Sequence, residues 1–311
     1  MNKILVSPSS FGECGSEPLD LLKKAGFEVV PNPFGRKLDE NETISLGLDV
    51  IGVVAGVETY NKNIIDQLTQ LKCISRVGVG IDSIDLDYLK EKKIEICITP
   101  NGPTQAVAEL SLSLALNLLR RVGVSDRRIR KGIWKKETGN LLKGKKVGII
   151  GLGRIGKKAA SLYKALGCSV IAYDRFADTK WMKENSVLNL SFEEVIKEAD
   201  ILSIHVPGME NEKPLFSETE LRELKKEVII INLSRGGVID EQALYQHLKN
   251  NPGTFAALDV FVEEPYKGEL TELDNILLTP HMGSYAKEAK LTMEVDAVNN
   301  LIAFFKNGIK F

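Results

Sequence analysis

Several side chains suited to proton transfer and anion binding come directly after short apolar runs, which we interpret as strands. In chain order these are His205, Arg235, the acidic group of Asp259, Glu263 and Glu264, and finally His281. In an open α/β sheet, ligands bind beyond the carboxyl ends of the strands. We therefore expect a guanidinium, a carboxylate pair and two imidazoles to meet at one edge of a sheet.

This combination suits hydride transfer to or from a carbonyl group that lies next to a carboxylate. Histidine titrates near neutral pH and can give or take the proton. Arginine binds a carboxylate through two parallel hydrogen bonds. A neighbouring carboxylate favours the charged imidazole and fixes its orientation.

A second motif predicts the hydride carrier. The sequence Gly151-Leu152-Gly153-Arg154-Ile155-Gly156 follows the apolar run 146–150 and precedes an amphipathic helical segment that stops at Gly167. In such a turn the first glycine allows the tight bend, the second admits a pyrophosphate close to the backbone, and the third lets the helix pack on the sheet. The helix N-terminus adds N–H donors and a positive dipole end. The motif therefore predicts a bound dinucleotide.

Asp174 distinguishes between the two nicotinamide dinucleotides. It follows the next predicted strand, 18 residues after Gly156. A carboxylate at this position accepts hydrogen bonds from a ribose diol and repels a 2′-phosphate, which favours NAD. The adjacent Arg175 could pair with a 2′-phosphate, so NADP stays an alternative.

The elements that position these residues alternate between strand and helix, which is typical of parallel sheets. One series of short apolar runs ends near residue 98, and six more runs extend from 146 to 278. Between the two series lies a strongly apolar helical stretch, 107–119, which we expect to be buried nearly all round, as at a domain junction or a subunit interface. One last helix is expected over residues 285–306. We predict an α/β fold with two doubly wound parallel-sheet domains.

The overall composition excludes several functional classes. The 311 residues include 41 Lys+Arg and 42 Asp+Glu, giving a net charge of −1, so we expect neither nucleic-acid nor anionic-membrane binding. No apolar stretch approaches the ~18 residues of a membrane span. The four cysteines form no C-x-x-C pair and there are only three histidines, so we expect no metal site and a cytoplasmic location with free thiols. His247, within the expected helix 241–249, is predicted to be exposed.

Several separate motifs resemble those of the D-isomer-specific 2-hydroxyacid dehydrogenases, a family that includes the short phosphoglycerate dehydrogenases. The first is Gly78-Val79-Gly80-Ile81-Asp82-Ser83-Ile84-Asp85, with Ser83 in place of the family's asparagine. The others are Thr99-Pro100-Asn101-Gly102, Leu233-Ser234-Arg235-Gly236-Gly237, the stretch from Asp259 to Pro265, and Thr279-Pro280-His281-Met282-Gly283. The resemblance covers essentially the whole chain.

The resemblance implies specific roles for these residues. Arg235 binds the substrate carboxylate, His281 is the acid/base, and Glu264, which directly precedes Pro265, is the partner of His281. Gly78, Val79 and Gly80 offer backbone N–H groups to the substrate carboxylate, and Asp259 bonds the nicotinamide amide. The expected cofactor contacts are completed by Gly151, Gly153, Arg154, Ile155, Gly156, Asp174, His205, Val206, Pro207, Leu233, Ser234 and Gly283.

It also implies an architecture. A discontinuous, flavodoxin-like substrate domain is expected over residues 1–99 and 284–311, and a Rossmann NAD-binding domain over 100–283. A homodimer is expected to form through the segment from Leu110 to Trp134. Because the sequence ends at Phe311, we expect no C-terminal regulatory domain.

The substrate is a small 2-hydroxyacid or 2-ketoacid, with D-3-phosphoglycerate as one candidate. An arginine that meets a substrate phosphate is expected in the loop 55–61, but this loop contains none, and Glu58 would repel an anion. Lys62 could compensate. A non-catalytic, NADH-sensing dimer resembling the dehydrogenase-like corepressors is the alternative function, although such a sensor does not need Arg235, Glu264 and His281 together.

Overall fold

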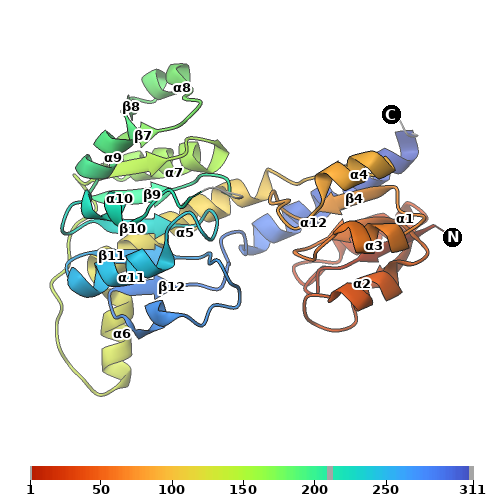
Figure 1. Cartoon of the computed structure of the whole chain (residues 1–311), viewed down its shortest axis with the longest axis horizontal. Helices are drawn as coiled ribbons and strands as arrows, with labels where there is room; N and C mark the ends of the chain where they lie inside the picture. Colours follow the sequence, from red (N-terminus) through yellow and green to blue (C-terminus); the bar gives the residue numbers. More distant parts are fainter. Residues whose placement is uncertain (1, 209–212, 308–311) are drawn as a thin grey trace. The chain divides into compact units, whose positions relative to one another are not determined.

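The computed structural model describes residues 2–208 and 213–307. The chain divides into two compact units (Figure 1). Unit 1 comprises Met1–Pro103 and Ser284–Phe311, and unit 2 comprises Thr104–Gly283. Each unit contains its own parallel sheet.

The sheet of unit 1 has five parallel strands in the order β2-β1-β3-β4-β5. These strands are β1 (Lys3–Val6), β2 (Glu28–Pro31), β3 (Val50–Ala55), β4 (Cys73–Arg76) and β5 (Glu95–Cys97). The order 2-1-3-4-5 is that of flavodoxin-like folds. The predicted fold of this unit is therefore confirmed.

Helices cover both faces of this sheet, because successive strand residues point to opposite sides. Leu5, Val53 and Ile74 belong to one buried cluster, whereas Ile4, Val6 and Cys73 belong to another that includes Val298 and Leu301 of the last helix. The helices of unit 1 are α1 (Glu17–Lys24), α2 (Glu40–Gly47), α3 (Lys62–Gln67), α4 (Leu86–Lys92) and α12 (Lys287–Asn307). The last helix thus completes a core that starts with the first strand.

The sheet of unit 2 has seven parallel strands in the order β12-β11-β10-β9-β6-β7-β8. They are β6 (Lys146–Ile150), β7 (Ser169–Tyr173), β8 (Leu188–Asn189), β9 (Ile201–Ile204), β10 (Ile229–Asn232), β11 (Phe255–Leu258) and β12 (Ile276–Leu278). The order reverses at β6, which is the Rossmann pattern with its binding crevice between β6 and β9. Six strands were predicted, and β8 was missed because its two residues are exposed and form no apolar run.

The helices of unit 2 pack around this sheet, and their buried side chains form two clusters. They are α5 (Gly102–Arg120), α6 (Val122–Arg130), α7 (Arg154–Ala165), α8 (Thr179–Glu184), α9 (Phe192–Glu198), α10 (Glu218–Arg222) and α11 (Glu241–Asn250), with a short 3-10 turn, η1 (Glu269–Glu272). Within one copy of the chain, α5 is not buried all round, so the expected burial of the whole helix is not reached in a single chain. Glu109, Ser113 and Leu116 form an exposed stripe along it.

The first division between the units falls after Pro103, four residues beyond the boundary expected from the sequence. The first turn of α5 explains the difference. A Cβ atom at Gly102 would lie 2.4 Å from Met293 of α12, so this turn packs in unit 1. In the described residues, no helix is long and apolar enough to cross a membrane.

Candidate active site

The glycine turn after β6 has the geometry that a dinucleotide needs. Gly151 has a φ of +91°, and a Cβ there would lie 2.5 Å from the His205 carbonyl oxygen. Gly156 is equally restricted, since its Cβ would lie 2.0 Å from the Gly151 carbonyl oxygen. Gly153, the N-cap of α7, faces open space, because a Cβ placed there would meet nothing within 4 Å. The turn is therefore closed at its ends and open at its centre, beside the N-terminus of α7.

Asp174 lies beside this turn. Its Oδ2 accepts a hydrogen bond from the Leu152 N–H at 2.5 Å, and its Oδ1 accepts one from the Phe176 N–H at 2.7 Å. The carboxylate thus joins the glycine turn to the loop after β7. Arg175 is exposed. These residues fit a dinucleotide whose ribose reaches the end of β7.

His205 follows β9 at the opposite side of the crevice. Its Nε2 lies 2.9 Å from the Ser203 hydroxyl, which lies 2.9 Å from the Ser111 hydroxyl, and Ser111 lies 3.0 Å from the Tyr163 hydroxyl. Burial lowers the pKa of His205 to about 4. The ring is therefore neutral at physiological pH and fixed by a buried hydrogen-bond chain. Val206 and the exposed Pro207 follow it.

The loop after β10 carries Leu233, Ser234 and Arg235. Leu233 and Ser234 are buried, and the Ser234 hydroxyl donates to Asn232 Oδ1 at 2.7 Å. A guanidinium nitrogen of Arg235 donates to the Ser234 carbonyl oxygen at 2.7 Å. A Cβ at Gly236 would lie 2.0 Å from the Phe261 carbonyl oxygen, so this loop packs directly against the segment that follows β11.

Asp259, at the end of β11, is only 1% exposed and holds the segment that contains His281. Its two oxygens accept hydrogen bonds from the Thr279 hydroxyl at 2.6 Å, the Met282 N–H at 2.8 Å and the Gly283 N–H at 2.7 Å. The sequence indicated a nicotinamide contact for Asp259 and did not reveal this clamp. The clamp fixes the residues on both sides of His281.

His281 and Glu264 form a direct pair. The Nδ1 atom of His281 lies 2.8 Å from Glu264 Oε2, and Glu264 Oε1 accepts the Phe261 N–H at 3.1 Å. The side chains of the pair are 48% and 38% exposed. His281 has a φ of +51°, a left-handed conformation that is uncommon for residues other than glycine. With Nδ1 bonded to the carboxylate, Nε2 is the ring nitrogen left for proton transfer.

Strand pairing shows that Arg235, Glu264 and His281 follow three adjacent strands at one edge of the sheet. The Asp259 N–H donates to the Asn232 carbonyl at 3.1 Å, and the Thr279 N–H donates to the Leu258 carbonyl at 2.9 Å. Glu263 is exposed.

The sequence analysis missed Glu241, whose Oε1 accepts the Val262 N–H at 2.7 Å. Burial, and then repulsion by Asp240 and Glu264, raises the pKa of Glu241.

Two sequence interpretations need correction. The N–H of Gly78, in unit 1, donates to the Thr99 hydroxyl at 2.7 Å and is not available to a substrate carboxylate. Val79 is 42% exposed, and in the described part of the chain neither its N–H nor that of Gly80 donates to a backbone carbonyl in the turns and loops. His247 is half-buried and not fully exposed as predicted: its Nε2 is buried, and this burial lowers its pKa. Among the residues with assigned positions, no cluster of His, Cys, Asp and Glu could hold a metal ion.

Comparison with protein families identifies the class. The model of the D-isomer specific 2-hydroxyacid dehydrogenase NAD-binding domain matches residues 112–283. The chain belongs to this family. This dehydrogenase therefore contains the NAD-binding domain that the glycine turn and Asp174 predicted, and its enzyme class is that of the NAD-dependent D-2-hydroxyacid dehydrogenases.

Curated relatives differ in the substrate that they are named for. The dehydrogenase is 38% identical to a glyoxylate reductase of Thermococcus litoralis, over 81% of this chain and 79% of the relative. It is 34% identical to a hydroxypyruvate reductase of Thermotoga maritima, over 92% and 95%. It is 32% identical to a D-3-phosphoglycerate dehydrogenase of Bacillus subtilis, covering 98% of this chain but 57% of that relative.

Solved structures agree on the fold. The TT0316 protein of Thermus thermophilus matches with a TM-score of 0.88 and 31% identity, over 98% of this chain and 97% of that chain. A D-lactate dehydrogenase of Aquifex aeolicus, solved with NAD and lactic acid, matches with a TM-score of 0.83 and 26% identity, over 98% and 96%. The two-domain architecture is therefore common to these proteins.

Proposed function

We propose that this dehydrogenase interconverts a small 2-ketoacid and its D-2-hydroxyacid with NADH as the reductant. The observation that carries the proposal is the 2.8 Å hydrogen bond between His281 Nδ1 and Glu264 Oε2. It fixes an imidazole with one nitrogen held by a carboxylate and the other available to a substrate oxygen. A structural turn residue needs no such partner.

Each residue then has one task. His281 donates the proton from Nε2 to the carbonyl oxygen, and Glu264 orients the ring and stabilises its charged form. Arg235 of unit 2 binds the substrate carboxylate and polarises the carbonyl. For unit 1 we propose separately that Val79 and Gly80 offer their N–H groups to the substrate. NADH, when bound, supplies the hydride. Asp259 keeps His281 in place through the backbone on its C-terminal side.

The cofactor contacts follow the same proposal. The open turn at Gly153 and the N-terminus of α7 receive the pyrophosphate, and Asp174 receives the adenosine ribose. His205, Val206, Pro207, Leu233, Ser234 and Gly283 complete the cofactor side, together with Arg154 and Ile155. The relatives support glyoxylate, hydroxypyruvate and similar acids as substrates.

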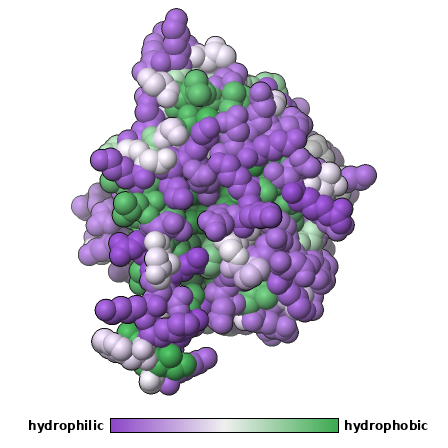
Figure 2. Space-filling model, turned by 90° about the vertical axis from the view of Figure 1, so that its left-hand side faces the viewer, coloured by the Kyte–Doolittle hydropathy of each residue, from purple (hydrophilic) through white to green (hydrophobic). Residues whose placement is uncertain are grey.

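We also propose a homodimer through α5, α6 and the segment that follows them. Leu116, Val122, Ile129, Ile133, Trp134 and Leu141 are large apolar side chains here with exposures from 38% to 85%. Figure 2 shows green atoms among purple ones at its lower end, where Figure 1 places α6. Several large apolar side chains exposed within one segment are more than isolated surface apolar residues, and they favour an interface here. The cytoplasmic location that the sequence suggests is likewise a proposal.

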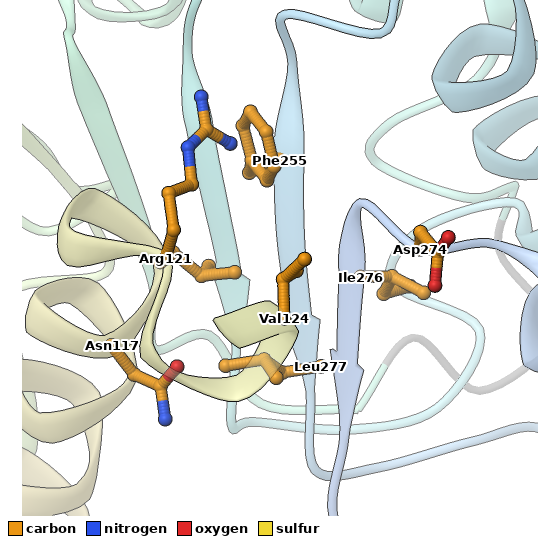
Figure 3. A pocket seen from close by; sticks show the side chains of 8 residues that line it. Asn117, Arg121, Val124, Phe255, Asp274, Ile276 and Leu277 are labelled. Atoms are coloured by element: carbon orange, nitrogen blue, oxygen red, sulfur yellow. The ribbon is translucent and has the colours of Figure 1, made fainter. Parts of the chain in front are cut away.

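A small pocket adjoins this surface between α5–α6 and strands β11 and β12 (Figure 3). Its lining includes Asn117, Val124, Phe255, Ile276 and Leu277. The Arg121 guanidinium lies 3.4 Å from the centre of the Phe255 ring.

A panel of 2-ketoacids tests the proposed reaction. The protein is mixed with NADH and glyoxylate, hydroxypyruvate, pyruvate, 2-ketoglutarate or 3-phosphohydroxypyruvate, and the absorbance at ~340 nm is followed. We expect NADH oxidation with at least one acid. The variant His281→Gln should lose roughly 10²–10⁴-fold in kcat, the usual contribution of acid–base catalysis, while binding NADH normally. NADH binding without turnover of any acid would instead indicate the sensor alternative.

A further inference from the structure

Three hydroxyl groups are buried together in the core of unit 2, although they come from three different elements. They belong to Ser111 on α5, Tyr163 on α7 and Ser203 on β9, and each of these residues is 0% exposed. Burying a hydroxyl is costly unless it is hydrogen-bonded. The three hydroxyls bond one another in a chain that ends at Nε2 of His205. The proposed proton transfer to the substrate uses none of the three.

The contacts of Tyr163 give this hydroxyl chain a direction. The Tyr163 hydroxyl donates to the Ser111 carbonyl oxygen at 3.1 Å. Burial raises the pKa of Tyr163, so the hydroxyl keeps its proton. A hydroxyl has only one proton to donate. The 3.0 Å contact between the hydroxyls of Tyr163 and Ser111 must therefore use the proton of Ser111.

The same argument continues along the chain to His205. The Ser111 proton is already used, so the 2.9 Å contact between the hydroxyls of Ser203 and Ser111 uses the proton of Ser203. The 2.9 Å contact between the Ser203 hydroxyl and His205 Nε2 must then use a proton of the ring. All four contacts are hydrogen bonds at once only in this order. The neutral His205 ring thus carries its proton on Nε2, and Nδ1 keeps its lone pair.

Nδ1 of His205 is accessible at the end of β9. No group in the described residues bonds Nδ1. In the same part of the chain, the buried nitrogen and oxygen atoms without a partner belong to Tyr60, Ser75 and His247, so Nδ1 is not enclosed. The His205 N–H donates to the Ile150 carbonyl at 2.7 Å, and a Cβ at Gly151 would lie 2.5 Å from the His205 carbonyl oxygen. His205 therefore adjoins the glycine turn, where a dinucleotide binds.

We propose that Tyr163, Ser111 and Ser203 are positioning residues that hold the His205 ring with Nδ1 as a hydrogen-bond acceptor for the dinucleotide. The inference rests on the proposed function, in which His205 belongs to the cofactor side. The group that Nδ1 accepts from is an N–H or O–H donor of the cofactor, either the nicotinamide carboxamide or a ribose hydroxyl. Because every link of the chain is needed for this order, the loss of one buried hydroxyl reverses the protons that follow it.

Ser111→Ala tests the proton order. In this variant the buried Ser203 hydroxyl loses its acceptor, so its proton turns to His205 Nε2 and the ring proton moves to Nδ1. Long-range 1H–15N correlation spectra of the imidazole rings distinguish the two tautomers in the protein without cofactor. The chain has only three histidines, and the variant His205→Asn identifies the His205 signals. We expect the proton on Nε2 in the wild type and on Nδ1 in Ser111→Ala.

NADH titration tests the contact with the cofactor. A ring with its proton on Nδ1 cannot accept there, so Ser111→Ala should bind NADH about five- to tenfold more weakly, the usual effect of one hydrogen bond. The control is Ser161→Ala, which removes an exposed hydroxyl of α7 that bonds only the Lys157 carbonyl. This control should match the wild type in tautomer and in NADH affinity.

A cofactor analogue identifies the donor. Reduced 3-acetylpyridine adenine dinucleotide lacks the carboxamide N–H. If Ser111→Ala weakens the binding of NADH but not of the analogue, the carboxamide is the donor. If both bind more weakly by the same factor, the donor is a ribose hydroxyl.

Three results would overturn the inference. The first is a wild type whose His205 proton lies on Nδ1. The second is a Ser111→Ala protein that keeps the proton on Nε2, whatever its NADH affinity, and the third is an altered tautomer with unchanged NADH affinity. Should Ser111→Ala fold poorly by circular dichroism, Tyr163→Phe replaces it, because it keeps the ring, removes the acceptor of the Ser111 proton and should shift the tautomer likewise. NADH oxidation with none of the 2-ketoacids defeats the proposed function and leaves the tautomer measurement in force.

Discussion

At the residue scale, proton transfer depends on how His281 is held. Its ring bonds Glu264 at 2.8 Å, and its backbone has a φ of +51°. The buried Asp259 bonds the two N–H groups that follow His281. A left-handed conformation at a residue other than glycine persists only when its surroundings impose it. Asp259 therefore fixes the backbone conformation of His281, and Glu264 fixes the orientation of its imidazole ring.

Two neighbouring glutamates offer a matched test of this division. Glu264→Gln should lower kcat on the order of 10²-fold, because the imidazole loses the carboxylate that orients it and stabilises its charge. Glu263→Gln removes the same charge one residue away, from an exposed side chain, and should behave as the wild type. Steady-state kinetics and NADH fluorescence titration check both variants. Equal losses in the two variants would contradict the assignment.

The sequence predicted the residues of this site better than their contacts. The choice of Glu264 over Glu263 agrees with the observed hydrogen bond to His281. Three features could not be foreseen: the hydrogen bonds from Asp259 to the His281 segment, the use of the Gly78 N–H by Thr99, and the burial of His247 Nε2. Each depends on the packing of segments that are distant in the sequence, and residue type alone carries no information on it.

At the element scale, two glycines of the turn between β6 and α7 have different roles: we expect Gly156 to matter for stability and Gly153 for NADH binding. Gly156→Ala should destabilise the protein by several kcal/mol, because its Cβ would overlap the Gly151 carbonyl oxygen, 2.0 Å away. Gly153→Ala should cost only about 0.5–1 kcal/mol, the usual difference between Gly and Ala at an N-cap, since the site is open and its φ is −70°. It should nevertheless weaken NADH binding, because a methyl group occupies the phosphate approach.

Thermal unfolding and NADH titration distinguish these two glycine variants. A Gly153→Ala protein with unchanged NADH affinity would mean that the pyrophosphate does not approach this turn.

The turn between β6 and α7 could be predicted from the sequence because its strand, its glycines and its helix follow each other without interruption. The strand β8 was not, since two exposed residues leave no periodic signal.

His205, which follows β9, should make the stability of the protein depend on pH. Burial lowers the pKa of His205 from 6.5 to about 4 in the folded protein. As the pH falls below 6.5, the unfolded chain binds this proton first, so stability is lost between pH 6.5 and 4. His205→Asn lacks this group and should lose about 2 kcal/mol less than the wild type between pH 7 and 5. Urea unfolding at both pH values measures the difference, and equal losses would refute it.

At the scale of the whole molecule, the exposed apolar side chains of α6 and its following segment predict the assembly. Sedimentation should give about twice the 34.3 kDa of one chain. Ile129→Asp places a charge on a side chain that is 55% exposed, so it should release monomers without lowering the stability of the monomer. A wild type that sediments as a monomer at micromolar concentration would contradict the proposed interface.

The path of the chain through unit 1 has a consequence for biosynthesis. Residues 104–283 form unit 2 without interruption, whereas unit 1 needs Val298 and Leu301 of α12 to cover Ile4, Val6 and Cys73. During translation, unit 2 can thus close while still attached to the ribosome. One apolar face of the five N-terminal strands stays uncovered until α12 has been synthesised. A nascent chain stalled before α12 should be a preferred client of chaperones that bind exposed hydrophobic surface.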